Sequence, residues 1–232
     1  MRTLLLVISF YYFSNMLATA QTLLPTIEQY CRQIENEFEL ISQERKENLH
    51  VLASYISEQL KQNKAVQLNF ICTHNSRRSQ LAQVWAQVGA MYYGISREKL
   101  QTFSGGTEAT ACNERTIAAL QRVGFQIVKN GFITPTNPIY HLTYAQETSP
   151  LALFSKVYSD AANPQRDFAA VLVCSQADEA CPIVRGAALR LYHGYEDPKK
   201  SDGTPQETAV YDATCRLIAR EMLYLFSRID KD

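Results

Sequence analysis

A cysteine, an arginine and a serine stand close together in the stretch "CTHNSRRSQLAQ", which begins at Cys72. Arg78 follows the cysteine six residues later, and Ser79 comes next. A cysteine in a loop before a helix is a competent nucleophile, since backbone N–H groups and the start of the helix favour the thiolate form. An arginine can donate two parallel hydrogen bonds to a tetrahedral anion. We therefore predict that this loop holds a phosphate-like oxyanion and that Cys72 attacks it.

The segments on either side of the loop predict how it is held. Residues 65–72, "AVQLNFIC", predict a buried strand, and residues 79–93 keep the apolar spacing of a helix. The carboxyl end of a strand, just before a helix, is where α/β sheets bind ligands. Asn75 tolerates the left-handed backbone that a tight loop needs, and we expect Ser79 to donate to the thiolate. The cysteine-to-arginine spacing alone is a weak signal. The alternative interpretation, in which a buried cysteine at a strand end merely neighbours a solvated arginine, therefore stays open.

Strands and helices alternate along the rest of the chain. The predicted elements are strands at 100–107, 137–144 and 169–175, and helices at 113–123 and 208–229. This alternation predicts an α/β fold, a three-layer sandwich in which helices cover both faces of a mainly parallel central sheet. Residues 130–166 contain several prolines and show no clear period.

The region before the first strand has helical spacing. We expect a helical extension over residues 21–64, with one helix entered through a capping box at Thr26 and Gln29 and a second entered near Ser42. It would pack as a hairpin on the catalytic domain, residues 65–232. Nothing in its sequence demands a binding partner.

The first twenty residues resemble an export signal. Arg2 precedes the apolar run 4–13, and "ATA" at 18–20 is a small-residue cleavage pattern. The run is about half as long as the roughly 20 residues that span a membrane. We therefore predict a signal peptide over residues 1–20, export to the periplasm or the outside, and no stable membrane anchor. An uncleaved amphipathic or buried helix is the alternative.

Composition excludes several classes of function. The chain is 46% hydrophobic and 20% charged, which is ordinary for a globular protein, and its 23 basic residues equal its 23 acidic ones. No global field would draw it to nucleic acid. His50, His141 and His193 lack the short paired spacing of zinc ligands, so we expect no bound metal. The sequence has no nucleotide-binding glycine pattern, so we expect no nucleotide cofactor. The oligomeric state stays open.

Four segments together resemble one protein family. "CTHNSRRSQLAQ" is similar to the phosphate-binding loop of low-molecular-weight protein tyrosine phosphatases and of the arsenate reductases that share their fold. "FSGGTEATACNERTIAALQRVGF" resembles the second strand and helix of that group. "VLVCSQADEACP" and "YEDPKKSDGTPQET" look like later segments, especially those of the thioredoxin-coupled reductases. The resemblance covers about residues 66–229 and leaves out the helical extension.

The resemblance implies a role for each matching residue. Cys72 would be the nucleophile, Arg78 the oxyanion ligand and Asp197, in "YEDP", the general acid. The loop around the oxyanion would comprise Thr73, His74, Asn75, Ser76, Arg77 and Ser79.

The loop departs from the family pattern at two positions. His74 stands where the family usually has glycine, and it would add bulk at the rim. Arg77 stands where the family has a second cysteine. We expect the Arg77 side chain to point outward into solvent.

Two enzymatic readings follow from the resemblance. In the first, a phosphatase hydrolyses phosphotyrosine in a protein or another phosphate monoester through a cysteinyl-phosphate intermediate. In the second, an arsenate reductase passes oxidation from Cys72 to Cys174 and Cys181, which stand at the family's spacing in "CSQADEAC". The predicted export favours the phosphatase, because outside the cytoplasm that cysteine pair could stay oxidised as a structural disulfide. A non-catalytic oxyanion-binding module is the third reading.

The remaining cysteines have a simpler expectation. Cys31, Cys112 and Cys215 are read as small buried apolar residues, although some cysteines of an exported protein could pair.

Overall fold

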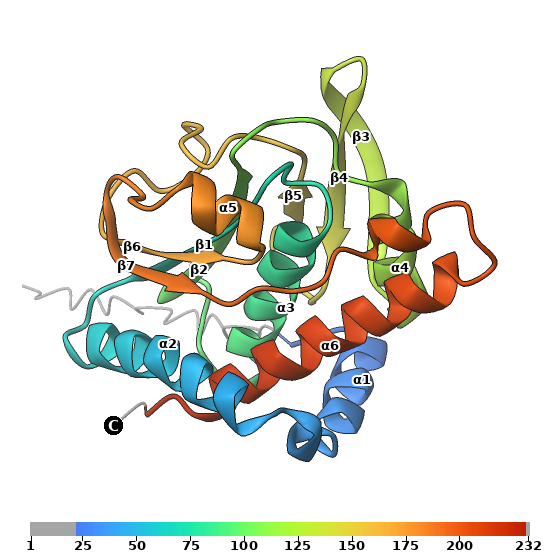
Figure 1. Ribbon diagram of the computed structural model, residues 1–232. Helices are drawn as coiled ribbons and strands as arrows, with labels where there is room; N and C mark the ends of the chain where they lie inside the picture. Colours follow the sequence, from blue (N-terminus) through green and yellow to red (C-terminus); the bar gives the residue numbers. More distant parts are fainter. Residues whose placement is uncertain (1–21, 231–232) are drawn as a thin grey trace, which may run out of the picture.

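The computed structural model describes residues 22–230 (Figure 1). The predicted signal peptide, residues 1–20, lies outside the described residues, so export stays a prediction. Among residues 22–230, no helix is both long and apolar enough to cross a membrane.

A four-stranded parallel sheet forms the centre of the fold. Its strands run in the order β2-β1-β6-β7, with bounds β1 Val66–Cys72, β2 Leu100–Gly106, β6 Phe168–Leu172 and β7 Ala187–Tyr192. β1 pairs in parallel with both of its neighbours, so Cys72 lies opposite Gly106, and Ile71 lies opposite Leu172. The predicted parallel sheet is confirmed, and its carboxyl ends meet at one edge.

Helices lie on both sides of this sheet, as predicted. α3 (Arg78–Tyr92) packs on β1 and β2 and is itself covered by α6 (Glu207–Ser227). α5 (Ser175–Ala180) contacts β1 and β6 and lies on the opposite side of the sheet from α6 (Figure 1). α4 (Glu114–Val123) begins at the cap Asn113 and ends at Gly124, and it packs on α6. A short 3-10 turn, η2 (Pro198–Ser201), precedes α6.

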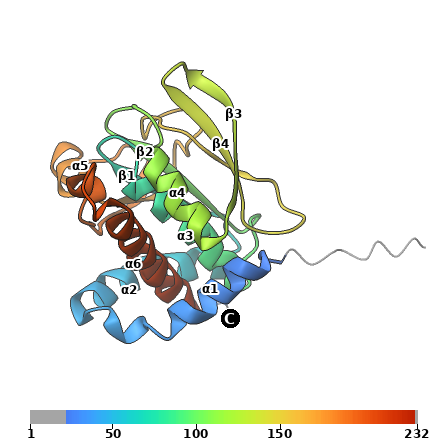
Figure 2. The ribbon, with the colours of Figure 1, turned by 90° about the vertical axis from the view of Figure 1, so that its right-hand side faces the viewer.

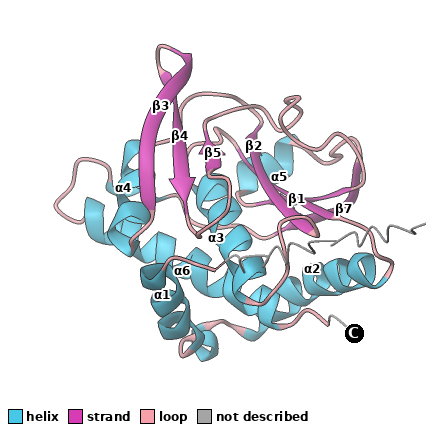
Figure 3. Cartoon of the chain, turned by 180° about the vertical axis from the view of Figure 1, so that it is seen from behind, coloured by secondary structure: helices cyan, strands magenta, loops and turns pink. Residues whose placement is uncertain are grey.

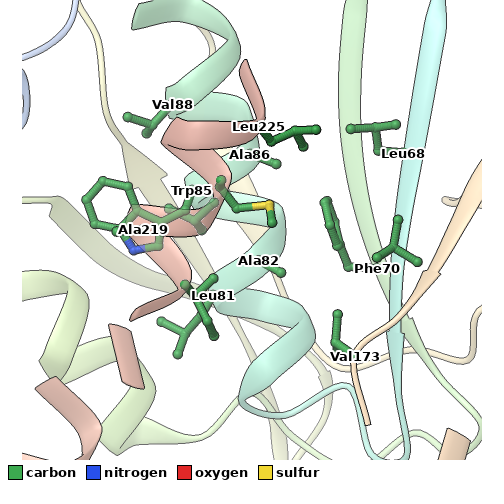
Figure 4. Packing of buried hydrophobic residues seen from close by; sticks show 14 of the residues in the cluster. Leu68, Phe70, Leu81, Ala82, Trp85, Ala86, Val88, Val173, Ala219 and Leu225 are labelled. Carbon is green, nitrogen blue, oxygen red and sulfur yellow. The ribbon is translucent and has the colours of Figure 1, made fainter. Parts of the chain in front are cut away.

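The core between β1, α3 and α6 is apolar and fully buried (Figure 4). Leu68 and Phe70 of β1 point toward Ala82 and Ala86 of α3, whereas Trp85 lies on the other side of that helix, next to Ala219 of α6. The side chains of Leu68, Phe70 and Trp85 are inaccessible to solvent. The indole N–H of Trp85 donates to the sulfur of Cys215, 3.2 Å away, so its polar atom is satisfied. Burial of each large apolar side chain contributes roughly 1.5–3 kcal/mol, which holds β1 and the loop after it in a fixed place.

The segment 130–166 contains a second sheet that the sequence did not predict. β3 (Gln126–Thr134), β4 (Asn137–Thr143) and β5 (Leu151–Leu153) pair antiparallel in that order. The predicted strand at 137–144 therefore exists but belongs to this sheet. The β3–β4 hairpin extends away from the parallel sheet (Figure 2), and β3 is exposed along nearly its whole length. Its sequence consequently lacks an alternating apolar face.

The helical extension lies below the main sheet, and both of its helices pack on α6 (Figure 3). It consists of α1 (Pro25–Glu35), a 3-10 turn η1 (Phe38–Leu40) and α2 (Gln43–Lys61). Ser42 caps α2, because its hydroxyl accepts from the N–H of Arg45 at 3.4 Å. The capping box predicted at Thr26 is wrong: Leu24 is the N-cap without a side-chain bond, and Pro25 begins the helix with a backbone angle already suited to it.

Candidate active site

The loop after Cys72 is packed tightly against β2. Cys72 is the last residue of β1 and is 3% exposed. A β-carbon added at Gly106 would lie 2.7 Å from the Thr73 carbonyl oxygen and 2.8 Å from the Asn75 nitrogen. Only glycine therefore lets the loop approach the sheet edge this closely, which explains why β2 ends with a glycine at position 106.

Asn75 fixes the shape of the loop. Its backbone is left-handed, with φ of 45°, as the sequence predicted for this residue type. Its side-chain oxygen accepts from the N–H of Lys156 at 3.0 Å, and its carbonyl accepts from Gln80 at 3.0 Å. Its amide group donates to the hydroxyl of Ser79 at 2.9 Å. Asn75 thus ties the loop to α3 and to the segment after β5.

The hydroxyl of Ser79 faces the thiol of Cys72. The two atoms, Oγ and Sγ, lie 3.1 Å apart. Because Asn75 already donates to this oxygen, the hydroxyl hydrogen is free to point at the sulfur. Ser79 is therefore arranged to donate to a Cys72 thiolate.

The loop that carries Cys72 also offers backbone N–H donors. Within the described part of the chain, the N–H groups of residues 73–79 donate to no protein acceptor. They comprise the loop and the first turn of α3, whose N-terminus carries partial positive charge. Successive free N–H groups of this kind form a concave site for an anion.

The guanidinium of Arg78 lies beside the loop, and its Nε has no partner among the described residues. The group is buried, and it donates through NH1 to the Tyr195 carbonyl at 3.0 Å and through NH2 to Asp197 at 2.8 Å. A buried donor without a partner is costly, and an oxyanion in the loop would satisfy it.

Asp197 is brought next to this arginine by the turn that follows it. One carboxylate oxygen accepts from Arg78, and the other caps η2 by accepting from the N–H of Lys199 at 3.1 Å. The side chain is 26% exposed, so one side of the carboxyl group reaches solvent. The structure therefore brings Arg78 and Asp197, two of the three residues expected to be catalytic, into direct contact. The third, Cys72, contacts Ser79, the residue after Arg78.

Cys174 stands next to the loop, two residues beyond the end of β6, as the N-cap of α5. The N–H of Val173 donates to the carbonyl of Ile71 at 2.8 Å, which extends the pairing of β1 and β6 to the sheet edge. The sulfur of Cys174 lies 3.5 Å from the hydroxyl of Thr73. This thiol therefore contacts the loop at the residue that follows Cys72.

Cys181 stands at the far end of α5 from Cys174. Both cysteines are buried free thiols, as are the other four. Burial raises the pKa of the Cys181 thiol, while hydrogen bonding from Tyr158 and the charge of Arg190 oppose that rise. Arg190 also donates to the Cys181 carbonyl at 3.0 Å and to the Asp178 carbonyl at 2.9 Å, which anchors α5 to β7.

The two loop positions that depart from the family have defined surroundings. Arg77 donates to the Tyr211 hydroxyl at 2.7 Å and to Asp202 at 3.2 Å, and its side chain is 12% exposed. The expectation that Arg77 points into solvent is therefore wrong, because α6 and the turn before it supply partners. His74 is half-exposed, and its Nε2 lies 3.8 Å from a Glu108 carboxylate oxygen.

Cavities open on both sides of the loop. One, of about 640 Å³, is lined by His74, Ser76 and Arg77 together with residues 110–115. The other, of about 540 Å³, is lined by Arg78, Asp197 and the first turn of α5. His74 therefore stands at the rim of the first cavity, as expected, and Ser76 is fixed there by donating to the Ala111 carbonyl at 2.6 Å.

Several residues of this site gave no sequence signal. Lys156 is almost completely buried beside the loop, and burial lowers the pKa of its ammonium group to about 8. Tyr195 contributes only a carbonyl to Arg78, which any residue type could provide. Both come from segments whose pattern was illegible or turn-like, so only the folded structure reveals them.

Sequence comparison identifies the family. The chain is 31% identical to an arsenate reductase of Oceanobacillus iheyensis over 138 residues, which are 60% of this chain and 78% of that relative. The chain belongs to the superfamily of low-molecular-weight protein tyrosine phosphatases and arsenate reductases. Another superfamily member, arsenate reductase 2 of Staphylococcus haemolyticus, is 32% identical over 129 residues, 56% of this chain and 76% of the relative.

No protein-family model matches the chain. Comparison with solved structures gives lower sequence identities. A low-molecular-weight phosphotyrosine phosphatase structure from Vibrio cholerae covers 70% of this chain and 95% of its own, with 15% identity and a TM-score of 0.46. A structure described as an arsenate reductase in the phosphate-binding state covers 71% of this chain and 99% of its own, with 15% identity and a TM-score of 0.45.

Proposed function

We propose that this protein is an arsenate reductase that uses a relay of three thiols, Cys72, Cys174 and Cys181. The observation that carries the proposal is the position of Cys174, whose sulfur lies 3.5 Å from Thr73 at the edge where Cys72 ends its strand. The sequence alone led us to prefer a phosphatase. The relatives named above are arsenate reductases, and they favour the second reading instead.

In the proposed reaction, arsenate binds among the N–H groups of residues 73–79 and the Nε of Arg78. The Cys72 thiolate attacks arsenic, and one arsenate oxygen leaves as water after protonation. The Cys174 thiolate then attacks the sulfur of Cys72, and the sulfur–arsenic electron pair stays on arsenic. Arsenic is thereby reduced from the +5 to the +3 state and leaves as arsenite, while the two cysteines become a disulfide.

The last steps return the site to its starting state. The Cys181 thiolate attacks Cys174, which releases Cys72 and leaves a Cys174–Cys181 disulfide. An external dithiol such as thioredoxin supplies two electrons and two protons to reduce that disulfide. If the protein is exported, as predicted, its compartment must provide such a donor.

The phosphatase remains the second candidate because of one contact. Asp197 lies 2.8 Å from Arg78 with part of its carboxyl group exposed, a place from which an acid can protonate the leaving oxygen of a phosphate ester. The Cys72 intermediate would then be a thiophosphate that water hydrolyses.

The two candidates separate in one set of assays. We expect reduced protein to form arsenite from arsenate with thioredoxin or another dithiol as donor, and Cys174→Ser to abolish multiple turnover. Cys112→Ser is the matched control, since Cys112 is also a buried thiol but is not part of the relay. This control should keep the activity.

Three other results would redirect the proposal. Hydrolysis of p-nitrophenyl phosphate that needs Cys72 but not Cys174, without arsenite formation, would establish the phosphatase. Arsenate reduction that persists in Cys174→Ser would exclude the relay. Phosphate binding that needs Arg78, without either reaction, would leave only the oxyanion-binding module.

A further inference from the structure

The helical extension contacts the catalytic domain through an ion pair whose acid is buried and whose arginine is partly exposed. Arg45 of α2 donates to both carboxylate oxygens of Glu221 in α6, through Nε and, at 2.7 Å, through NH2. Glu221 is 1% exposed. Its bonds to Arg45 and His193 outweigh the effect of burial and lower the pKa of the carboxyl group to about 2. A two-point contact of this kind fixes the plane and position of the guanidinium.

The same guanidinium holds the backbone of the segment 192–197. Its NH1 donates to the Gly194 carbonyl at 3.1 Å, and its carbon lies 5.1 Å from the centre of the Tyr195 ring. One turn along α2, the amide of Asn48 donates to the Tyr192 carbonyl at 2.6 Å. Two residues of the extension thus hold consecutive parts of one irregular segment.

His193 completes the contact from the segment's own side. The Asn48 amide nitrogen lies 3.1 Å from its Nδ1. Its Nε2 lies 2.9 Å from a carboxylate oxygen of Glu221 and 2.9 Å from the NH2 of Arg45. Glu221 therefore joins α2 and the segment 192–197 at one buried point.

The other end of this segment holds the oxyanion arginine. The Tyr195 carbonyl accepts from Arg78 at 3.0 Å, and the Asp197 carboxylate accepts from it at 2.8 Å. Arg45 and Arg78 thus donate hydrogen bonds to the carbonyls of two consecutive residues, Gly194 and Tyr195. Both arginines line the cavity of about 540 Å³. A shift of that backbone at Gly194 would move both acceptors of Arg78.

We propose that Arg45 is a positioning residue for the active site: through Gly194 and Tyr195 it sets where Arg78 and Asp197 stand. The helical extension then contributes to the geometry of the active site. The kinetic part of this inference rests on the proposed reductase. The binding part does not, because phosphate affinity is measured without turnover.

A paired substitution tests this without leaving a buried charge. The variant Arg45→Met with Glu221→Gln removes both charges and the grip on Gly194. We expect roughly a tenfold fall in kcat for arsenate reduction and a several-fold weaker Kd for inorganic phosphate, since small displacements in a catalytic site are costly. Arsenate KM should rise by the same factor as the phosphate Kd.

The chain offers a matched control for the extension itself. Glu37, just after α1, pairs with Arg216 and Arg220 of α6 and has no bond to residues 192–197. Glu37→Gln should lower the melting temperature and leave kcat and the phosphate Kd within twofold. A paired variant that changes these constants no more than Glu37→Gln would overturn the inference.

Two milder variants keep the test decisive if the paired variant fails to fold. Arg45→Lys retains a charge for Glu221 but cannot reach both the carboxylate and Gly194 with a fixed fork. Asn48→Ala removes only the contacts to Tyr192 and His193. We expect each to lower kcat and phosphate affinity measurably at an almost unchanged melting temperature. A kcat and a phosphate Kd equal to those of the wild type in both variants would contradict the positioning role. Wild-type protein that binds phosphate but does not reduce arsenate would refute only the proposed reductase activity.

Discussion

The hydroxyl of Ser79 lies 3.1 Å from the sulfur of Cys72, and the amide of Asn75 donates to that same hydroxyl. The order of donation is therefore fixed from Asn75 through Ser79 to the thiolate. A nucleophile held in this way keeps its orientation before substrate arrives. This chain of donors leads to the first prediction.

Ser79→Ala removes the last donor to Cys72. Hydrogen bonds to charged groups are worth about 1.5–3 kcal/mol, so we expect kcat/KM for arsenate to fall by roughly 10- to 100-fold. The comparison is Ser227→Ala, which removes a hydroxyl that donates to the Tyr224 carbonyl at the end of α6. Equal kinetics of wild type and Ser79→Ala would exclude this donor from the mechanism.

Asp197→Asn separates the two candidate reactions. The amide keeps the size of the side chain but cannot protonate a leaving oxygen and loses the charge that faces Arg78. Any hydrolysis of a phosphate ester should fall by about 100-fold or more, because general acid catalysis contributes 10²–10⁴-fold. Phosphate binding should persist. Unchanged ester hydrolysis in this variant would show that Asp197 is not the acid.

Lys156 destabilises the fold at neutral pH. Burial lowers the pKa of its ammonium group to about 8, so between pH 10.5 and 8 the unfolded chain takes up a proton that the folded chain does not. Stability falls as the pH drops through this window. Lys156→Met should therefore raise the free energy of unfolding at pH 7 by about 1–3 kcal/mol, with a smaller gain at pH 10.

Urea denaturation at the two pH values measures this effect. Lys64→Met, at an exposed lysine before β1, is the control and should change neither value. If Lys156→Met changed the free energy of unfolding equally at pH 7 and pH 10, the buried ammonium group would not destabilise the fold.

The buried cluster around Glu221 predicts how acid unfolds the protein. The carboxyl pKa is lowered to about 2, so its contribution is complete above about pH 4.5 and is lost as the pH falls toward 2. That contribution is about 2–3 kcal/mol. Burial also lowers the pKa of His193, so the unfolded chain gains a proton below its ordinary value of 6.5, and stability falls further in the same direction.

Unfolding free energies at pH 7, 5, 4 and 3 test this cluster. The paired variant Arg45→Met with Glu221→Gln lacks the titrating carboxyl group and should lose stability less steeply below pH 4.5. An identical acid slope in both proteins would show that other carboxylates control acid unfolding.

The parallel sheet and the loop could be predicted because local pattern and local chemistry coincide there. β1 is a mainly apolar run, and Asn75, Arg78 and Ser79, whose residue types predicted the site, lie within seven positions of Cys72. Asn75 and Ser79 act on each other within one turn, so their residue types were informative. The long helix α6 was equally clear from its spacing.

What the sequence did not reveal depends on contacts between distant segments. Arg45 and Glu221 are 176 positions apart, and neither residue type at its position signals the other. The fate of Arg77 was mispredicted for the same reason, since Tyr211 comes from a helix far along the chain. The second sheet was missed because its outer strand is exposed on both faces and has no apolar period.

The central claim is that Cys72, Cys174 and Cys181 form one relay started by an oxyanion in the loop. Fully reduced protein should be mixed with arsenate without any external thiol, and its mass and disulfides mapped. We predict arsenite in amounts equal to the protein, loss of two hydrogen atoms, and a Cys174–Cys181 disulfide, with Cys181→Ser stopping at a Cys72–Cys174 disulfide. Protein that keeps all six thiols after this treatment would contradict the account.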